Sequence, residues 1–217
     1  TLYVGGPGAT AYALGDAAHP IATLEEAVTR INGLAEADYT IELAGGTAYI
    51  LSAPLTLNQN TVLNGNGASI GGIGGSQTVA PPAGIVVSPG AEDVTVQELT
   101  IRDFPTGIQT TSQGGCLNLV NTTVEFCDIG LDLAETYQLE IDLGSSEIRN
   151  CGTGVRFAAG SSNNSLGSGV VSNNAGDGIR FEGGNESPDA NRIENVDVQG
   201  NAGNGIVVLD GANNVIV

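Results

Sequence analysis

A pair formed by a glycine and an aliphatic residue recurs along the chain and constrains the fold more than any other feature. It occurs at Gly84-Ile85, Gly107-Ile108, Gly130-Leu131, Gly154-Val155, Gly178-Ile179 and Gly205-Ile206. The steps between these glycines are 23, 23, 24, 24 and 27 residues. A short and nearly constant period is typical of solenoids, in which each repeat forms one layer stacked on the next.

Apolar and variable positions alternate after each glycine, as in a β-strand whose successive side chains point to opposite faces. The expected inward pairs are Ile108/Thr110, Leu131/Leu133, Val155/Phe157, Ile179/Phe181 and Ile206/Val208. The expected outward residues are Gln109, Asp132, Arg156, Arg180 and Val207. Two more apolar columns keep the step: Val96, Leu119, Leu143, Leu166, Ile193 and Ile216, and Ile101, Val124, Ile148, Val171 and Val198. Three short strands per step predict an all-β solenoid, a single-stranded parallel β-helix.

The corners of the coils carry asparagine and glycine. Asn150, Asn174 and Asn201 are expected at one corner, and Asn164, Asn191 and Asn214 at another, where they replace Val94, Leu117 and Ile141. Stacked asparagines can satisfy one another's amides, and each such hydrogen bond contributes about 1 kcal/mol. Glycine suits a corner where the backbone needs a positive φ or a close approach. We interpret these residues as structural.

The N-terminal residues predict a cap of a different kind. After a strand at residues 1–6, Thr23 is placed to cap a helix and Glu26 to complete a capping box. Apolar residues follow at helical spacing, and Gly33 marks the helix end: Leu24, Ala27, Val28, Ile31 and Leu34. We therefore expect residues 1–39 to form an N-terminal cap with an amphipathic helix over the first coil, and residues 40–217 to form one continuous run of coils.

Several segments resemble known β-helix proteins. The opening Leu2-Tyr3-Val4-Gly5-Gly6 and the stretch from His19 to Val28 look like the cap of right-handed parallel β-helix proteins of the pectate-lyase-like class. The stretch from Thr40 to Gly46, continued through Leu55-Thr56-Leu57 to Ala68, is similar to the first coils of bacterial cell-surface β-helix proteins. The run from Ser172 to Ile179 resembles repeats of carbohydrate-binding and sugar-hydrolase β-helices. The resemblance implies a right-handed helix and an extracellular place, but no single function, because this fold hosts many.

The charge balance narrows the class of partner. The 217 residues contain 24 acidic and 6 basic side chains, giving a net charge of −18, and all the basic residues are arginines. Nucleic acid is disfavoured, because phosphate binding needs clustered cations. No apolar run is long enough to span a membrane, so membrane insertion is not expected.

No catalytic set is recognisable in the sequence. The polygalacturonase-type hydrolases of this fold carry paired aspartates beside Gly-His-Gly and Arg-Ile-Lys segments, and neither segment occurs. The only histidine, His19, precedes the expected cap helix and is interpreted as a loop or capping residue. Lysine is absent. We therefore assign no catalytic residues.

An arginine column is the first candidate for a ligand site. Arg156 and Arg180 are expected to stack one coil apart, with Asp132 in the preceding coil and Glu182 two residues after Arg180. A uronate carboxylate between two arginines would suit bidentate recognition. Lyases of this fold can use arginine as the base, so a uronate lyase stays open. The alternative is a set of surface ion pairs that stabilise the fold weakly.

An acidic loop is the only hint of a cofactor. Glu182, Glu186 and Asp189 lie in the coil with the 27-residue step, and their oxygens could hold calcium. A solvated acidic loop is the alternative. A second long insertion, residues 71–82, carries no charged residue and suits a flap or contact surface.

The three cysteines leave the redox state open. Cys127 and Cys151 occupy equivalent positions of adjacent coils, so their Cα atoms should lie about 5 Å apart, within disulfide range. Phe104, Ala175 and Ala202 are expected in the same column, which favours cysteine as a small packed hydrophobe. Cys116 has no evident partner.

The sequence thus favours a non-catalytic extracellular or cell-surface module for adhesion, assembly or carbohydrate binding. The alternative is a lyase or epimerase fragment acting on anionic glycans. The chain ends within a coil at Val217, and an uncapped coil exposes strand edges and apolar core. We therefore expect either more chain or another copy to stack there, the latter forming a head-to-tail filament.

Overall fold

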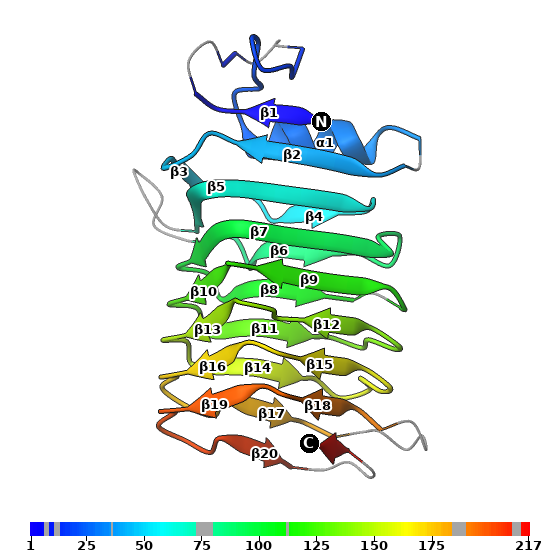
Figure 1. Cartoon of the computed structure of the whole chain (residues 1–217), viewed down its shortest axis with the longest axis vertical. Coiled ribbons are helices and arrows are strands. Elements are labelled where there is room, and N and C mark those ends of the chain that lie inside the picture. Colours follow the sequence, from blue (N-terminus) through cyan, green and yellow to red (C-terminus); the bar gives the residue numbers. More distant parts are fainter. Residues whose placement is uncertain are drawn as a thin grey trace.

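The protein is a column of parallel coils. The structure is a computed structural model, and it describes residues 1–6, 9–10, 14–35, 37–72, 80–111, 113–183, 190–209 and 214–217. Every pair of neighbouring strands within the column runs parallel, and the chain winds from the N-terminal end to the other without reversing (Figure 1). The expectation of a parallel β-helix is confirmed.

Each coil contributes to three faces, which we call face 1, face 2 and face 3. Face 1 holds β1 (Leu2–Val4), β2 (Tyr39–Leu43), β9 (Cys116–Val120), β12 (Glu140–Asp142), β15 (Ser165–Gly167), β18 (Arg192–Glu194) and β21 (Val215–Ile216). Face 2 holds β3 (Ala48–Ile50), β10 (Thr123–Glu125), β13 (Glu147–Arg149), β16 (Val170–Ser172) and β19 (Asp197–Gln199). Two long strands, β5 (Thr61–Gly71) and β7 (Asp93–Arg102), bend from face 1 into face 2. Face 3 holds β4 (Leu55–Leu57), β6 (Ala83–Val87), β8 (Thr106–Thr110), β11 (Ile129–Leu133), β14 (Thr153–Phe157), β17 (Ile179–Phe181) and β20 (Ile206–Val208).

The core is the stack of inward side chains that the repeat predicts. On face 3 the residues after the glycines pair in register from coil to coil: Ile85, Ile108, Leu131, Val155, Ile179 and Ile206. All but the last are fully buried. Phe157 and Phe181 stack with ring centroids 4.4 Å apart in the same interior. Burial of apolar surface stabilises the fold by about 25 cal/mol per Å², and here each coil buries its share against the next.

All of the repeated glycines except Gly205 are required by close packing. A Cβ at Gly130 would lie 2.3 Å from Cγ2 of Ile148, and one at Gly154 would lie 2.5 Å from Cγ1 of Val171. None of these glycines has a positive φ. Of the two reasons expected for glycine at this corner, close approach is therefore the one that applies.

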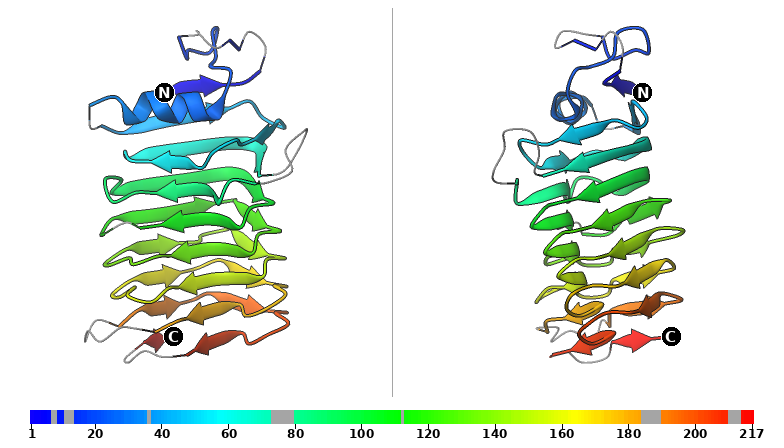
Figure 2. Two further views of the ribbon diagram at one scale, coloured as in Figure 1. Left: turned by 180° about the vertical axis from the view of Figure 1, so that it is seen from behind. Right: turned by 90° about the vertical axis from the view of Figure 1, so that its left-hand side faces the viewer.

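The N-terminal cap has the expected helix. α1 (Leu24–Asn32) begins after Thr23, whose Oγ1 accepts a hydrogen bond from the Glu26 amide at 3.2 Å. Its apolar stripe packs on the coil end beside β1 and β4 (Figure 2). Leu34 was included in that stripe by spacing, but it lies past the helix and is 55% exposed. Of the helices in the described part of the chain, none is long and apolar enough to cross a membrane.

The asparagine column between face 2 and face 3 differs from the prediction by one residue. Asn174 donates from Nδ2 to Oδ1 of Asn201 at 2.9 Å, as expected of a ladder. The placement of Asn150 in this column is wrong. Asn150 stacks with Asn173 instead, one position earlier, and both adopt a left-handed φ near +53° that lets the chain turn the corner.

The cysteine column continues into this ladder. The Cys151 amide donates to Oδ1 of Asn174 at 2.9 Å, so Asn174 is the next member of the column. The prediction that Ala175 and Ala202 share it is wrong by one residue. Because the corner is filled by thiols in two coils and by amides in the next two, the side chains along it change from weakly to strongly hydrogen bonding.

The other asparagine column is confirmed: Asn164, Asn191 and Asn214. What it replaces differs from the prediction. The Leu139 amide donates to Oδ1 of Asn164 at 3.0 Å, so the ladder takes over from Leu139. Ile141 pairs instead with Leu166, and the apolar column of face 1 therefore runs on unbroken. The assignment of Leu143 and Leu166 to one column is wrong by two residues.

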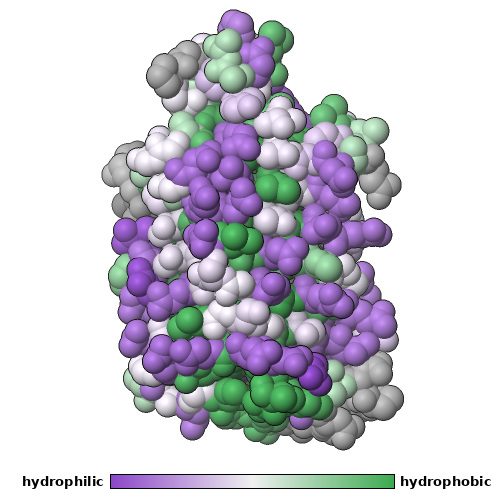
Figure 3. All heavy atoms as spheres, in the orientation of Figure 1, coloured by the Kyte–Doolittle hydropathy of each residue, from purple (hydrophilic) through white to green (hydrophobic). Residues whose placement is uncertain are grey.

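Apolar residues gather at one end of the surface shown in Figure 3. In this view hydrophilic residues alternate with less polar ones over most of the column, and hydrophobic residues gather at the last coil. There Val215, Ile216 and Val217 are 40%, 51% and 70% exposed.

Candidate functional site

The predicted column on face 3 is assembled as expected. Asp132 on β11, Arg156 on β14 and Arg180 on β17 are in register in three successive coils. Glu182 follows β17 and reaches both arginines, at 3.4 Å from Nε of Arg180 and 3.9 Å from Nη1 of Arg156. The structure therefore brings all four predicted ligand residues together.

Asp132 is the buried member of this column. Its side chain is 1% exposed, and its two oxygens accept hydrogen bonds from Nε and Nη2 of Arg156 at 2.8 and 2.7 Å. Gln109 adds a longer bond from Nε2 at 3.4 Å. The hydrogen bonds that Arg156 donates to Asp132 raise the pKa of Arg156. The outward position is thus filled by a bidentate ion pair between coils.

Arg180 is held by a carboxylate that sequence reasoning missed. Its Nη1 lies 3.0 Å from Oδ2 of Asp177, and Oδ1 of Asp177 accepts from the amide of Asn204 at 2.9 Å. That backbone hydrogen bond, together with Arg180, lowers the pKa of Asp177. Asp177 lies three residues before Arg180 at the turn into β17, and this spacing was the available signal.

The other arginines are also paired. Arg30 pairs with Glu26, Arg102 with Asp103, Arg149 with Glu125 and Glu147, and Arg192 with Glu194. Together with Arg156 and Arg180, these are all the cationic side chains of the chain apart from its single histidine. An anionic ligand would therefore meet a carboxylate beside every arginine that it approached.

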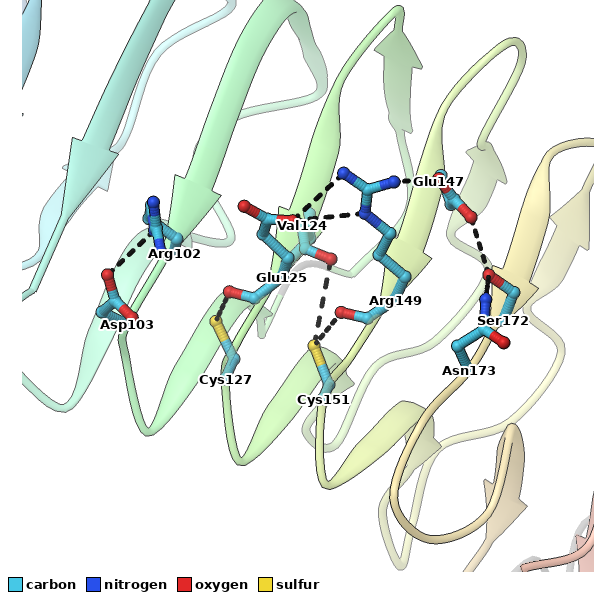
Figure 4. Close-up of polar contacts among 10 residues, drawn as sticks. All are labelled: Arg102, Asp103, Val124, Glu125, Cys127, Glu147, Arg149, Cys151, Ser172 and Asn173. Atoms are coloured by element: carbon cyan, nitrogen blue, oxygen red, sulfur yellow. Dashed lines mark hydrogen bonds and ion pairs between the residues drawn. The ribbon is translucent and has the colours of Figure 1, made fainter. Parts of the chain in front are cut away.

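The network on face 2 shows how one arginine is paired with carboxylates. Arg149 bridges Glu125 in the preceding coil and Glu147 on its own strand, at 3.2 and 3.1 Å (Figure 4). Ser172 in the next coil donates from Oγ to Oε1 of Glu147 at 2.7 Å. These contacts link three coils, and the charge of Arg149 is balanced within the network by two carboxylates.

The predicted calcium residues are only partly visible. Glu186 and Asp189 lie outside the described residues. Glu182 is described, and its carboxylate is occupied by the two arginines of face 3. Within the described ranges, no three histidine, cysteine or acidic side chains are grouped to hold a metal ion.

His19 lies in the loop before α1, as expected. Its Nδ1 is 3.1 Å from Oδ1 of Asp16, and its side chain is 64% exposed. The pair closes a short turn at the cap, remote from the outward columns of the coils.

A groove on face 1 was not anticipated. It consists of two hollows of ≈ 370 and ≈ 420 Å³ that share Glu140 and Ser165. The first is lined by Cys116, Asn118, Glu140, Ile141, Asp142, Ser165, Gly167, Ser168, Glu194 and Asn195. The second adds Gln138, Leu139, Asn163, Asn164, Ala190, Arg192 and Val215. The groove spans β9, β12, β15 and β18, and carboxylates, amides and hydroxyls supply most of its polar lining.

The side chains that line this groove carry a net negative charge. Glu140, Asp142 and Glu194 face one cation, Arg192, whose Nε is 2.9 Å from Oε2 of Glu194. That hydrogen bond lowers the pKa of Glu194. Burial and the nearby charge of Glu140 raise the pKa of the Cys116 thiol, so the thiol form is favoured there.

The available signal for the groove was the pair of acidic residues that flank Ile141 on β12. Glu140 and Asp142 point outward because Ile141 points inward. Sequence reasoning followed only the outward column of face 3, and the depth of a hollow depends on corner shapes that strand spacing does not give.

Comparisons with known proteins address the fold. No curated protein and no solved structure matches the chain. Residues 83–217, more than half of the chain, match the model of the right-handed β-helix region. The stacked parallel coils agree with that match in every described repeat. The chain therefore belongs to the right-handed β-helix family.

Proposed function

We propose that the chain is a non-catalytic carbohydrate-binding module that acts outside the cell or on its surface, and that the groove of face 1 is its binding site. The observation that carries the proposal is the continuity of the two hollows through Glu140 and Ser165. Together they form a shallow track across several coils, lined by both polar and apolar groups, which suits an extended chain better than a compact small molecule.

The polar lining fits sugar hydroxyls. Equivalent positions on β9, β12, β15 and β18 are spaced by the distance between parallel strands, about 4.8 Å. At one such row the side chains are Cys116, Glu140, Ser165 and Arg192, and at the next Asn118, Asp142 and Glu194. Carboxylate and amide groups hydrogen bond well to hydroxyls, and charged partners strengthen such bonds.

The charge of the groove selects among glycans. Its three carboxylates outnumber the single arginine, which is already paired with Glu194. The whole chain carries a charge of −18. Like charges repel at close range, so a neutral or amino-sugar polymer fits better than a polyuronate.

The alternative of a uronate lyase has one supporting feature, the arginine pair on face 3. A general base must be able to lose its proton near the working pH. The hydrogen bonds that Arg156 donates to Asp132 raise the pKa of Arg156, which works against that role. Arg180 has its own carboxylates in Asp177 and Glu182.

Titration calorimetry with a glycan panel tests the proposal. The panel contains neutral β-glucans and xylans, a chitosan oligomer and polygalacturonate. We expect a neutral or amino-sugar member to bind and polygalacturonate not to bind. Glu140→Gln and Asp142→Asn should each weaken binding about tenfold, the effect of losing one charged hydrogen bond.

The matched control is Asp197→Asn, which removes an exposed carboxylate from β19 on face 2. It should leave the affinity unchanged. Equal weakening by Asp197→Asn and Glu140→Gln would mean that net charge, and not the groove, determines binding. Appearance of unsaturated sugar ends by ultraviolet absorbance would establish the lyase instead.

A further inference from the structure

Cys127 and Cys151 lie next to each other in adjacent coils. They follow β10 and β13, which pair in register with Val124 beside Ile148. The pairing continues through the corner, because the Gly152 amide donates to the Cys127 carbonyl at 2.8 Å. Neighbouring parallel strands lie about 4.8 Å apart, and disulfides join residues whose Cα atoms are about 4.4–6.8 Å apart.

The two thiols are close enough to influence each other. The interaction with the Cys151 thiol, together with burial, raises the pKa of Cys127. The remaining contacts of the sulfurs are to backbone carbonyls, with Glu125 3.4 Å from Cys127 and Arg149 3.3 Å from Cys151 (Figure 4). Both side chains therefore point into the same corner and hold no competing charged partner.

The two sulfurs lie in equivalent positions of adjacent coils, each beside the repeated glycine of the preceding coil. A Cβ at Gly107 would lie 3.3 Å from Sγ of Cys127, and one at Gly130 would lie 3.4 Å from Sγ of Cys151. Both thiols therefore project to the same side of the corner, one above the other.

We propose that Cys127 and Cys151 form a disulfide bond that joins adjacent coils when the chain meets a low-molecular-weight disulfide. One thiolate attacks a sulfur of that disulfide and releases one small thiol. The second thiolate then attacks the resulting mixed disulfide and releases the other small thiol. The two protein thiols are oxidised, the small disulfide is reduced, and the two protons end on the released thiols.

The burial of the two thiols determines when the thiol–disulfide exchange can take place. Cys127 is 4% and Cys151 is 1% exposed, so a bulky oxidant cannot reach them in the closed corner. Exchange occurs while the corner is open, during folding or local opening. The bond closes a loop of about 24 residues, and such a loop should raise the melting temperature of a chain of this length by about 5–10 °C.

The test is to unfold the reduced protein and refold it in a glutathione redox buffer, followed by alkylation under denaturing conditions and mass analysis. Reduced protein should take up three alkyl groups, one for each cysteine. Refolded protein should take up one, on Cys116, and peptide mapping should find Cys127 linked to Cys151. Three alkyl groups on refolded protein, or a bridge to Cys116, would overturn the proposal.

Three variants keep the result interpretable. Cys116→Ala retains the pair and should lose both remaining alkylation sites and gain the same rise in melting temperature. Cys127→Ala and Cys151→Ala should form no internal bridge and show no rise. An oxidised wild type that melts at or below the temperature of the reduced protein would contradict the proposal that the disulfide bond stabilises the two coils.

Discussion

Arg156 donates hydrogen bonds to both carboxylate oxygens of Asp132, the residue at the same outward position of the preceding coil. Asp132 is 1% exposed, whereas the arginine retains 29% of its side-chain surface. Such a pair contributes chiefly by preventing an uncompensated buried charge. We therefore interpret the column that first suggested a ligand site as an ion-pair ladder between β11 and β14.

Replacement of Arg156 should destabilise the fold strongly. Arg156→Ala leaves the buried carboxylate of Asp132 with only the long bond from Gln109 among the described residues, and removing one partner of a buried pair costs about 3 kcal/mol. Denaturant unfolding followed by circular dichroism measures the change. The double variant Arg156→Ala/Asp132→Ala should recover part of the loss.

The control for this effect is Arg192→Ala. The ion pair of Arg192 with Glu194 is 45% and 43% exposed, and exposed pairs contribute about 0–1 kcal/mol. Equal losses for Arg156→Ala and Arg192→Ala would contradict the distinction between a buried and a surface pair.

Close packing at the glycine corner makes a second prediction. Gly130→Ala would place its Cβ 2.3 Å from Cγ2 of Ile148 and 2.7 Å from the Gly154 carbonyl, and such overpacking costs about 1–3 kcal/mol. Gly167→Ala is the matched control, because its Cβ would meet nothing nearer than 3.8 Å. Thermal unfolding of both variants should separate them, and a Gly130→Ala protein as stable as the control would refute the packing argument.

Much of the fold was predictable because the same pattern of residues recurs in each coil, so that each coil tests the interpretation of the others. The alternation after each glycine placed Leu131 and Val155 inward and Arg156 outward, and the structure confirms it. The prediction for Asn150 was wrong by one residue, because each corner contains one residue with left-handed φ and the residue type at that position varies. Phe126, Asn150 and Asn173 all occupy it.

The groove was harder to predict, because it is a property of shape. Glu140 and Asp142 were visible as outward carboxylates, but the hollow beside them depends on how the corners at Asn163 and Asn195 turn, both at positive φ. Side-chain pairing was predicted only in part. Spacing placed Arg180 near Glu182, but Asp177, three residues before Arg180, was not recognised as its partner.

The excess of acidic residues should make stability depend on salt. With 24 acidic and 6 basic side chains and every arginine already paired, repulsion between carboxylates outweighs attraction. Raising sodium chloride from about 10 mM to about 1 M shortens the Debye length from about 30 to 3 Å. The melting temperature should rise by at least about 2–4 °C, equivalent to about 1 kcal/mol for a chain of this length. A fall would mean that the ion pairs dominate.

Asp177 should contribute to acid sensitivity. Its backbone hydrogen bond from Asn204 and the charge of Arg180 lower its pKa below the ordinary 3.8. A lowered pKa gives stability that is present above the unfolded value and is lost as pH falls through the folded value, because the unfolded state then binds more protons. Unfolding free energies measured between pH 6 and pH 2.5 (about one unit below the range of ordinary carboxylates) should fall less steeply for Asp177→Asn. An unchanged slope would contradict this role.

The most direct test of the account is a hydrogen-exchange footprint of the bound glycan. With the tightest ligand of the panel, slower amide exchange should be confined to peptides that contain β9, β12, β15 and β18, where the groove lies. Slower exchange in β11, β14 and β17 would place binding on the arginine column of face 3, and either that result or the absence of any binding glycan would contradict the assignment of the groove as the binding site.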